Sequence, residues 1–180
     1  MFKRPAISIK SKSKSSMRKS MSVQLLSMLV ASAVCLLLGA AFPAWAALGG
    51  DITSVQADQL HMQGTIRSTP KASYTVHEIQ SPAGTVIREY VSSVGASTGK
   101  VFALAWQGPW PPDMRQLLGG YFDQYEQAAK AQSSARIGRK PLMIELPGLI
   151  VEMGGHPRAF TGRAYVPQML PSGVHAEEIQ

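Results

Sequence analysis

The sequence contains almost no cysteine. Its one thiol, Cys35, lies in an apolar run near the N-terminus, and no cysteine follows it in the 180 residues. Beyond residue 46 the chain therefore has no disulfide, no cysteine nucleophile and no thiolate metal ligand. Hydrophobic burial has to stabilise the fold, and the remaining chain is long enough for one domain with a sizeable core.

An excess of positive charge is also missing outside the N-terminus. The formal net charge is +7, but seven of the 18 Lys and Arg residues precede residue 20, so 11 remain to balance all 11 Asp and Glu. Because this remainder is formally neutral, its charge gives no reason to expect a nucleic-acid partner. The one tight basic group in it, Arg136, Arg139 and Lys140, is typical of a solvated helix end.

Motifs of the common catalytic and metal sites are missing. The sequence has no Gly-x-Ser-x-Gly nucleophile elbow, and its four histidines lack the close pair that zinc sites use. We therefore predict no catalytic residue, no cofactor and no metal. The weak exception is His156, a metal candidate that Gly154 and Gly155 would leave accessible at a turn.

The first 46 residues have the pattern of an export signal. A basic, serine-rich start is followed by an uncharged apolar run over 23–42 and then by Ala44-Trp45-Ala46. That tripeptide is the small-x-small pattern which a signal peptidase accepts. We predict a signal peptide over 1–46 that is cleaved between Ala46 and Ala47.

Two features of this leader stay open. Met17 is an alternative start, because it keeps two basic residues ahead of the apolar run. The run is also close to the ~20 residues that span a bilayer, so an uncleaved inner-membrane anchor is the alternative to cleavage. In both cases we expect export to the periplasm or the extracellular space, with membrane contact only through the leader.

The clearest element of the remaining chain is a helix over 114–131. Asp113 has the N-cap position, and Gln116 can reach back to its amide, which is the reciprocal pattern of a capping box. Apolar residues recur at the spacing of one buried helical stripe. Gly119 and Gly120 disfavour a helix interior, and we expect the close approach of a strand to compensate there.

A stiff connector precedes this helix. Its sequence, Gly108-Pro109-Trp110-Pro111-Pro112, cannot be helical, because proline lacks the amide donor and forces the preceding residue into extended geometry. We expect Trp110 to fold back onto the first helical turn.

Six segments have the composition and alternation of strands. They are 74–79, 85–91, 101–106, 142–146, 149–153 and 158–166. The first two form an antiparallel hairpin, because only a short turn separates them. In the third, we expect the large side chains Phe102, Leu104 and Trp106 to meet the helix.

Two turns follow from the glycines and prolines between the later strands. Pro147 disfavours the primed turns of tight hairpins, so we expect a loop wider than two residues around Pro147 and Gly148. The segment Gly154-Gly155-His156-Pro157 is predicted to turn the chain into its last strand.

These elements predict an α+β fold, with a small antiparallel β-sheet of about five to six strands packed against one main α-helix. Strands that are grouped before and after a single helix favour this class over alternating βαβ units. We assign 73–180 to a single α+β domain. Residues 47–72 show no clear element and form a poorly defined N-terminal segment.

Several segments also carry a resemblance to a known family. They are Ala47-Leu48-Gly49-Gly50, Tyr74–Ile79, Ile87–Val91, Val101–Trp106, Leu117–Phe122 and Gly162–Pro167. On these residues the chain resembles the bacterial domain-of-unknown-function family numbered 2844, over essentially everything after the leader. The resemblance implies an exported bacterial protein with a single domain, and it implies no activity.

Our leading hypothesis is a small exported, periplasmic protein that binds a small ligand or an envelope protein without catalysis. The first alternative is a small metal-dependent binder or hydrolase-like enzyme that uses His156 and carboxylates of the hairpins. The carboxylate pairs are Glu78 with Glu89 and Glu145 with Glu152, which could do acid–base chemistry if buried. The second alternative is a domain tethered to the membrane by an uncleaved N-terminal anchor.

Overall fold

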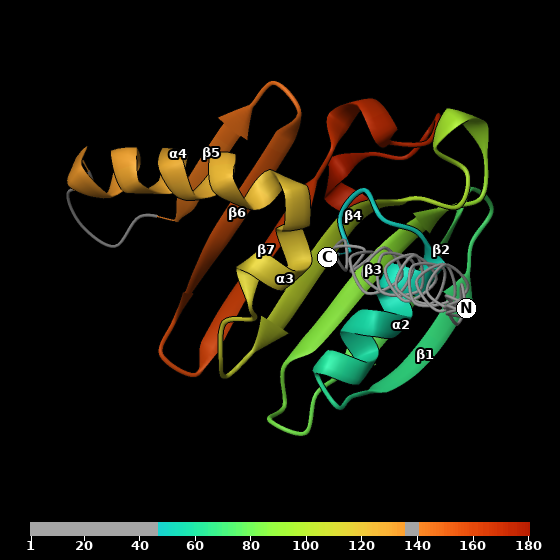
Figure 1. Cartoon of the computed structure of the whole chain (residues 1–180), viewed down its shortest axis with the longest axis horizontal. Coiled ribbons are helices and arrows are strands. Elements are labelled where there is room, and N and C mark those ends of the chain that lie inside the picture. Colours follow the sequence, from blue (N-terminus) through green and yellow to red (C-terminus); the bar gives the residue numbers. More distant parts are fainter. Residues whose placement is uncertain (1–46, 136–140) are drawn as a thin grey trace, which may run out of the picture. The chain divides into compact units, whose positions relative to one another are not determined.

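A seven-stranded antiparallel sheet forms the centre of the computed structural model (Figure 1). The structure describes residues 47–135 and 141–180. The strand order is β1-β2-β3-β4-β7-β6-β5, and every neighbouring pair is antiparallel. The strands are β1 (Thr65–Pro70), β2 (Tyr74–Gln80), β3 (Val86–Ser92), β4 (Val101–Gly108), β5 (Leu142–Leu146), β6 (Leu149–His156) and β7 (Ala159–Tyr165).

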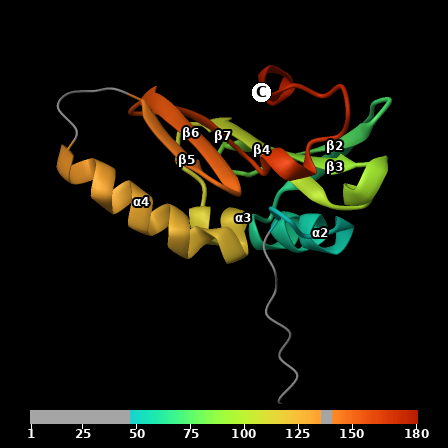
Figure 2. The same cartoon turned by 90° about the horizontal axis from the view of Figure 1, so that it is seen from above.

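Helices cover one face of this sheet, and the C-terminal segment covers the other (Figure 2). We call these faces the helix side and the tail side. The helices are α2 (Ile52–His61), α3 (Met114–Leu118), η2 (Gly119–Tyr121) and α4 (Phe122–Ala135), with short 3-10 turns at η1 (Gly95–Ser97), η3 (Pro167–Met169) and η4 (Ala176–Glu178). The predicted α+β class is confirmed. None of the helices within 47–135 and 141–180 has the length and apolar character needed to cross a membrane.

Alternation along the strands gives the sheet a core on each side. Ile79, Ile87 and Trp106 belong to the helix-side core, whereas Tyr74 and Tyr90 belong to the tail-side core. The predicted hairpin over 74–91 is confirmed as the antiparallel pair of β2 and β3.

Phe102 is an exception to the alternation that we predicted for β4. Leu104 and Trp106 pack on the helix side as predicted, but Phe102 packs on the tail side. The pairing of β3 with β4 shifts register between Tyr90 and Val91, which marks a β-bulge. The prediction for Phe102 was wrong because a bulge adds one residue to a strand and so breaks the period of two.

The helix predicted over 114–131 is present but interrupted. α3 ends at Gly119, whose φ of 49° lies in the left-handed region that favours glycine. A short 3-10 turn follows, and α4 begins at Phe122. Gly119 thus ends a helix, a role that the apolar periodicity does not predict.

The N-cap of this helix is confirmed, but the capping box is only half formed. The Asp113 carboxylate accepts hydrogen bonds from the backbone N–H groups of Arg115 and Gln116 at 2.9 and 3.2 Å. The side chain of Gln116 does not return to Asp113. It donates a hydrogen bond to Asp58 of α2 instead, which ties two helices together.

Residues 47–72, which the sequence left undefined, contain α2 and the edge strand β1. Asp51 caps α2 by accepting a hydrogen bond from the backbone N–H of Thr53 at 2.9 Å. Ala47 and Leu48 are buried in the helix-side core. This part of the chain is therefore packed against the rest, and β1 supplies the strand that the sequence analysis missed.

Both predicted turns differ from the structure. Only Pro147 and Gly148 lie between β5 and β6, so the loop is not wider than two residues. Neither residue has a positive φ, so this turn still avoids the primed types that proline disfavours. In the second case β6 continues through His156, and Arg158, with a φ of 69°, follows in the turn.

Trp110 does not become buried against the helix. Its side chain is 59% exposed. Together with Pro111 and Pro112 it lines an apolar pocket of about 180 Å³, which also touches Gln116 and the end of α2 at His61.

Some sequence-based predictions lie outside the described residues. They are the signal peptide over 1–46, with the alternative start at Met17, and the basic group at 136–140.

Gly162 of β7 leaves room for the indole of Trp106. A Cβ atom at this position would overlap the Trp106 ring and lie 2.6 Å from the carbonyl oxygen of Glu152. Because the sheet would have to shift, we expect Gly162→Ala to lower the free energy of unfolding by about 1–3 kcal/mol in urea denaturation. Gly148→Ala is the control, since a Cβ there meets nothing within 4 Å. Equal losses in both variants would contradict this packing.

Candidate functional site

A row of charged side chains crosses the tail side of the sheet. Cross-strand pairing aligns, from β1 to β6, Arg67, Glu78, Arg88, Ala105, Arg163 and Glu152. Arg88 forms an ion pair with Glu78 at 2.8 Å. On the far side of Ala105, Arg163 pairs with Glu152 at 2.9 Å. Opposite charges that face each other across strands stabilise the pairing, and the uncharged Ala105 leaves a gap in the middle.

The C-terminal segment docks over this gap. On one side of Ala105, Arg88 donates a hydrogen bond to the main-chain carbonyl oxygen of Gln180 at 3.1 Å. On the other side, Arg163 donates to the carbonyl oxygen of Ala176 at 2.7 Å. The two arginines therefore hold the tail against the sheet.

Three aromatic rings lie beneath the tail. The ring centroids of Tyr74, Tyr90 and Phe102 are 5.8, 5.8 and 6.1 Å apart, and Ile179 is buried with them. The Tyr90 hydroxyl donates to the carbonyl oxygen of Gln180 at 2.9 Å and accepts from its backbone N–H at 3.0 Å. Burial raises the pKa of Tyr90, so its hydroxyl stays protonated at neutral pH.

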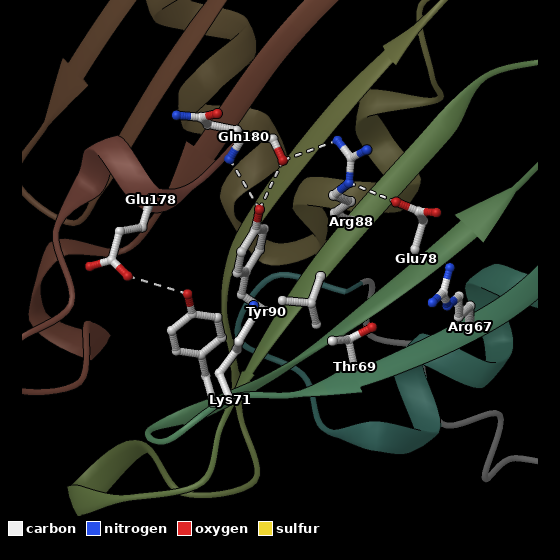
Figure 3. A pocket seen from close by; sticks show the side chains of 10 residues that line it. Arg67, Thr69, Lys71, Glu78, Arg88, Tyr90, Glu178 and Gln180 are labelled. Carbon is white, nitrogen blue, oxygen red and sulfur yellow. Dashed lines mark hydrogen bonds and ion pairs between the residues drawn. The ribbon is translucent and has the colours of Figure 1, made fainter.

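A cleft of about 540 Å³ opens beside the docked tail (Figure 3). We call it the tail-side cleft. Its lining comes from β1, β2, β3 and the C-terminal segment, and its charged residues are Arg67, Lys71, Glu78, Arg88 and Glu178. The volume lies within the usual range for small-molecule sites, about 300–1,000 Å³.

Two cations of the tail-side cleft are unpaired. Its carboxylates are already engaged, because Glu78 pairs with Arg88 and Glu178 accepts a hydrogen bond from the Tyr74 hydroxyl at 3.3 Å. Arg67 and Lys71 form no ion pair with any residue that the structure describes. The wall of the cleft at β1 therefore carries free positive charge.

On the helix side, two carboxyl groups are buried against each other. Asp58 of α2 and Glu89 of β3 are both 0% exposed, and they lie within hydrogen-bonding reach of one another. Asp58 also accepts a hydrogen bond from the side-chain amide of Gln116. A hydrogen bond between two carboxyl groups requires a proton on one of them, because an ionised carboxylate can only accept hydrogen bonds. Among the described residues neither oxygen of Glu89 has a hydrogen-bond partner, so an ionised Glu89 would be left unsatisfied.

Burial decides where that proton lies. Desolvation and the neighbouring Asp58 charge raise the pKa of Glu89 well above its ordinary value. Desolvation also raises the pKa of Asp58, but the hydrogen bond from Gln116 opposes this rise. These shifts favour a proton on Glu89, which can donate it to Asp58, and leave the negative charge of the pair on Asp58.

Few groups near the acid pair can balance its charge. His61 at the exposed end of α2 acts on Asp58 and favours the ionised carboxylate. His77 lies opposite Glu89 in the β2–β3 pairing, with Nδ1 2.8 Å from the Ser68 hydroxyl. Burial lowers the pKa of His77, so this ring is neutral at pH 7. No ion pair within 47–135 and 141–180 reaches either carboxyl group.

The structure places His156 apart from Glu78 and Glu89, two of the carboxylates that we grouped with it. His156 is exposed at the end of β6, with Nδ1 3.4 Å from the carbonyl oxygen of Pro157. Two strands, β7 and β4, lie between β6 and β3. In the part of the chain that the structure describes, no three His, Cys, Asp or Glu side chains are grouped to hold a metal ion.

The structure does not join the hairpin carboxylates into catalytic pairs. Glu78 lies on the tail side and Glu89 on the helix side, so the sheet separates them. On the second hairpin Glu145 is exposed, whereas Glu152 is taken up in its ion pair with Arg163.

Sequence reasoning missed most of these features. A single acid such as Asp58, in a segment without clear periodicity, looks like a solvated charge. The docking of Gln180 depends on Arg88, which is far away in the sequence. One local signal was available, since Glu89 shares a strand face with the apolar Ile87 and Val91 and so had to point into the core.

A family model described as a protein of unknown function, DUF2844, matches residues 44–179. The chain belongs to the DUF2844 family. This confirms the resemblance noted in the sequence, and the DUF2844 match includes the buried acid pair and every residue that lines the tail-side cleft except Gln180. Searches of curated proteins and of solved structures found no match.

The raised pKa of Glu89 predicts how the stability of this DUF2844 protein depends on pH. Between its ordinary value of about 4.3 and its raised value, the folded state binds more protons than the unfolded state. The free energy of unfolding should therefore fall as pH rises through this window. Glutamine resembles protonated glutamate, so Glu89→Gln should remove this fall and stabilise the protein at pH 8 by roughly 1–3 kcal/mol.

The measurement is urea denaturation between pH 5 and pH 9 on the parent protein and on Glu89→Gln. Glu145→Gln, which changes an exposed carboxylate of β5, serves as the control and should follow the parent protein. A Glu89→Gln variant that is no more stable than the parent at pH 8 would show that the acid pair holds no proton.

Proposed function

We propose that the protein is an exported binding protein of the cell envelope, whose tail-side cleft takes a small anionic ligand and does not transform it. The observation that carries this proposal is the free positive charge of Arg67 and Lys71 on the wall of a cleft of about 540 Å³. A cleft with unpaired cations attracts anions, and the attraction is screened by salt.

The composition of the cleft supports an anionic ligand with polar groups. The Tyr74 hydroxyl, whose pKa is raised by burial and by the adjacent Glu178, stays protonated and donates its hydrogen bond to Glu178. Thr69 adds a further hydroxyl beside Arg67. Hydroxyl and guanidinium donors together match a carboxylate or phosphate ligand.

Both carboxylates of the tail-side cleft already have hydrogen-bond or ion-pair partners, which supports binding without catalysis. A general base has to be free to accept a proton from the substrate. Glu78 is held by Arg88 at 2.8 Å, and Glu178 is held by Tyr74 and by the backbone N–H of His175 at 2.9 Å. These contacts fix the tail and leave the two cations as the groups that are available to a ligand.

Export is supported by the leader. A basic start, an apolar run and Ala44-Trp45-Ala46 are the parts that the secretion machinery recognises. The formally neutral, thiol-free remainder is compatible with an oxidising compartment such as the periplasm.

We expect calorimetric titration of the exported protein to detect binding of citrate or inorganic phosphate, but not of the uncharged polyol xylitol. The variant Arg67→Ala/Lys71→Ala should weaken binding at least about tenfold, because each cation contributes a charge-assisted hydrogen bond. Binding should also weaken as the salt concentration rises.

The matched control is Arg115→Ala/Lys130→Ala, which removes the same charge from the helices. It should leave the affinity within a factor of two of the parent, a range of about 0.4 kcal/mol. Equal weakening in both double variants would point to net charge alone, and the absence of citrate and phosphate binding would contradict the proposal.

A further inference from the structure

No cation within 47–135 and 141–180 forms an ion pair with the buried acid pair. Asp58 and Glu89 are both 0% exposed, and three carboxyl oxygens of the pair have no hydrogen-bond partner: Asp58 Oδ2 and both oxygens of Glu89. Glu89 can be satisfied by holding a proton and donating it to Asp58. Asp58 then remains as a buried negative charge with one free oxygen, which is costly unless a cation reaches it.

The residue beside that carboxylate is Ala47. Its side chain is 0% exposed, and its backbone N–H interacts with the Asp58 carboxyl group. The following residues fix this position, because Leu48 N–H donates to the carbonyl oxygen of Leu117 at 3.0 Å and Gly49 N–H donates to that of Val101 at 2.8 Å. The nitrogen of Ala47 is therefore held in the core, next to the unbalanced charge.

Ala47 is also the first residue after the predicted cleavage site. Hydrolysis of the Ala46–Ala47 peptide bond consumes one water, converts the Ala46 carbonyl to a carboxylate and converts the Ala47 nitrogen to an ammonium group. A buried ammonium group needs an anion as much as a buried carboxylate needs a cation. The Ala47 ammonium group would give Asp58 a cation, and the Asp58 carboxylate would give the ammonium group an anion.

We propose that removal of the leader after Ala46 completes the core, because the new α-ammonium group of Ala47 forms a buried ion pair with Asp58. This inference rests on the proposed export of the protein. In the processed protein Asp58 accepts hydrogen bonds from three sides: the Ala47 ammonium group, the Gln116 amide and the protonated Glu89. The site becomes electrically neutral, and the processed chain is more stable than one in which Ala47 remains in peptide linkage.

The first test uses the full chain, expressed with its own leader and purified after export. Mass analysis should show Ala47 as the first residue. Its amine should react with an acylating reagent at pH 8 at least about tenfold more slowly than an exposed α-amine, because burial hinders access and the ion pair favours the unreactive ammonium form. The comparison is a full chain with one glycine inserted between Ala46 and Ala47, whose displaced α-amine should label freely.

Thermal unfolding of the same two proteins gives the second readout. The inserted glycine moves the ammonium group away from Asp58, so the midpoint should fall by roughly 5–15 °C at pH 7. The difference should shrink at acidic pH as Asp58 takes up a proton, and again at alkaline pH as the Ala47 ammonium group loses one. His61 and His77 are the other titratable groups beside the pair, and both proteins contain them.

Asp58→Asn separates the ion pair from simple crowding by the added glycine. In the Asp58→Asn protein the glycine insertion should lower the unfolding midpoint by less than half as much as it does in the parent, since residue 58 no longer carries a charge for the ammonium group to pair with. An undiminished cost would overturn the proposal, as would rapid labelling of the Ala47 amine or an N-terminus at another residue. If Asp58→Asn does not fold, the labelling rates still decide the matter, and citrate binding tests the tail-side cleft independently.

Discussion

A carboxyl group buried against the middle of the sheet constrains the arrangement of the helix layer. Glu89 points from β3 into the helix side, where it cannot be hydrated. It is accommodated because α2 brings Asp58 against it and α3 brings Gln116 against Asp58. Three segments that are distant in sequence are thus joined by one polar network. Such networks specify a single packing arrangement when every member is satisfied, and they cost stability when one is not. The position of Ala47 beside Asp58 follows from the same constraint.

The two sides of the sheet have different structural roles. The helix side contains the large apolar core and the acid pair, and it determines stability. The tail side has a row of side chains with alternating charge. Two members of this row, Arg88 and Arg163, donate hydrogen bonds to the C-terminal segment. Docking of that segment leaves the tail-side cleft open next to β1, with cations that the fold itself does not use. A ligand site can therefore form there without weakening the core, since its charged groups are exposed to solvent on the face opposite Asp58.

Local patterns predicted the parts of this structure that local forces decide. The hairpin over 74–91 and the cap at Asp113 depend on neighbouring residues, and both are confirmed. The bulge that moves Phe102 to the tail side depends on how β4 pairs with β3, so the sequence pattern of β4 alone does not predict it. Asp58 and Gln180 were missed for a related reason, because each gains its role from a residue far along the chain. The acid on the apolar face of β3, Glu89, was the one sign that a polar partner had to exist.

The protonation of the acid pair tests the central claim most directly. Carbon-13 NMR of the side-chain carboxyl groups, followed from pH 3 to pH 9 in the parent protein, reports the charge on each acid. We predict that Glu89 keeps its proton at pH 7 while Asp58 is ionised, since desolvation raises the pKa of Glu89 more than that of Asp58. If both carbons titrate near pH 4, like those of solvated acids, then the two groups are hydrated, and the network that joins α2, α3 and β3 does not exist.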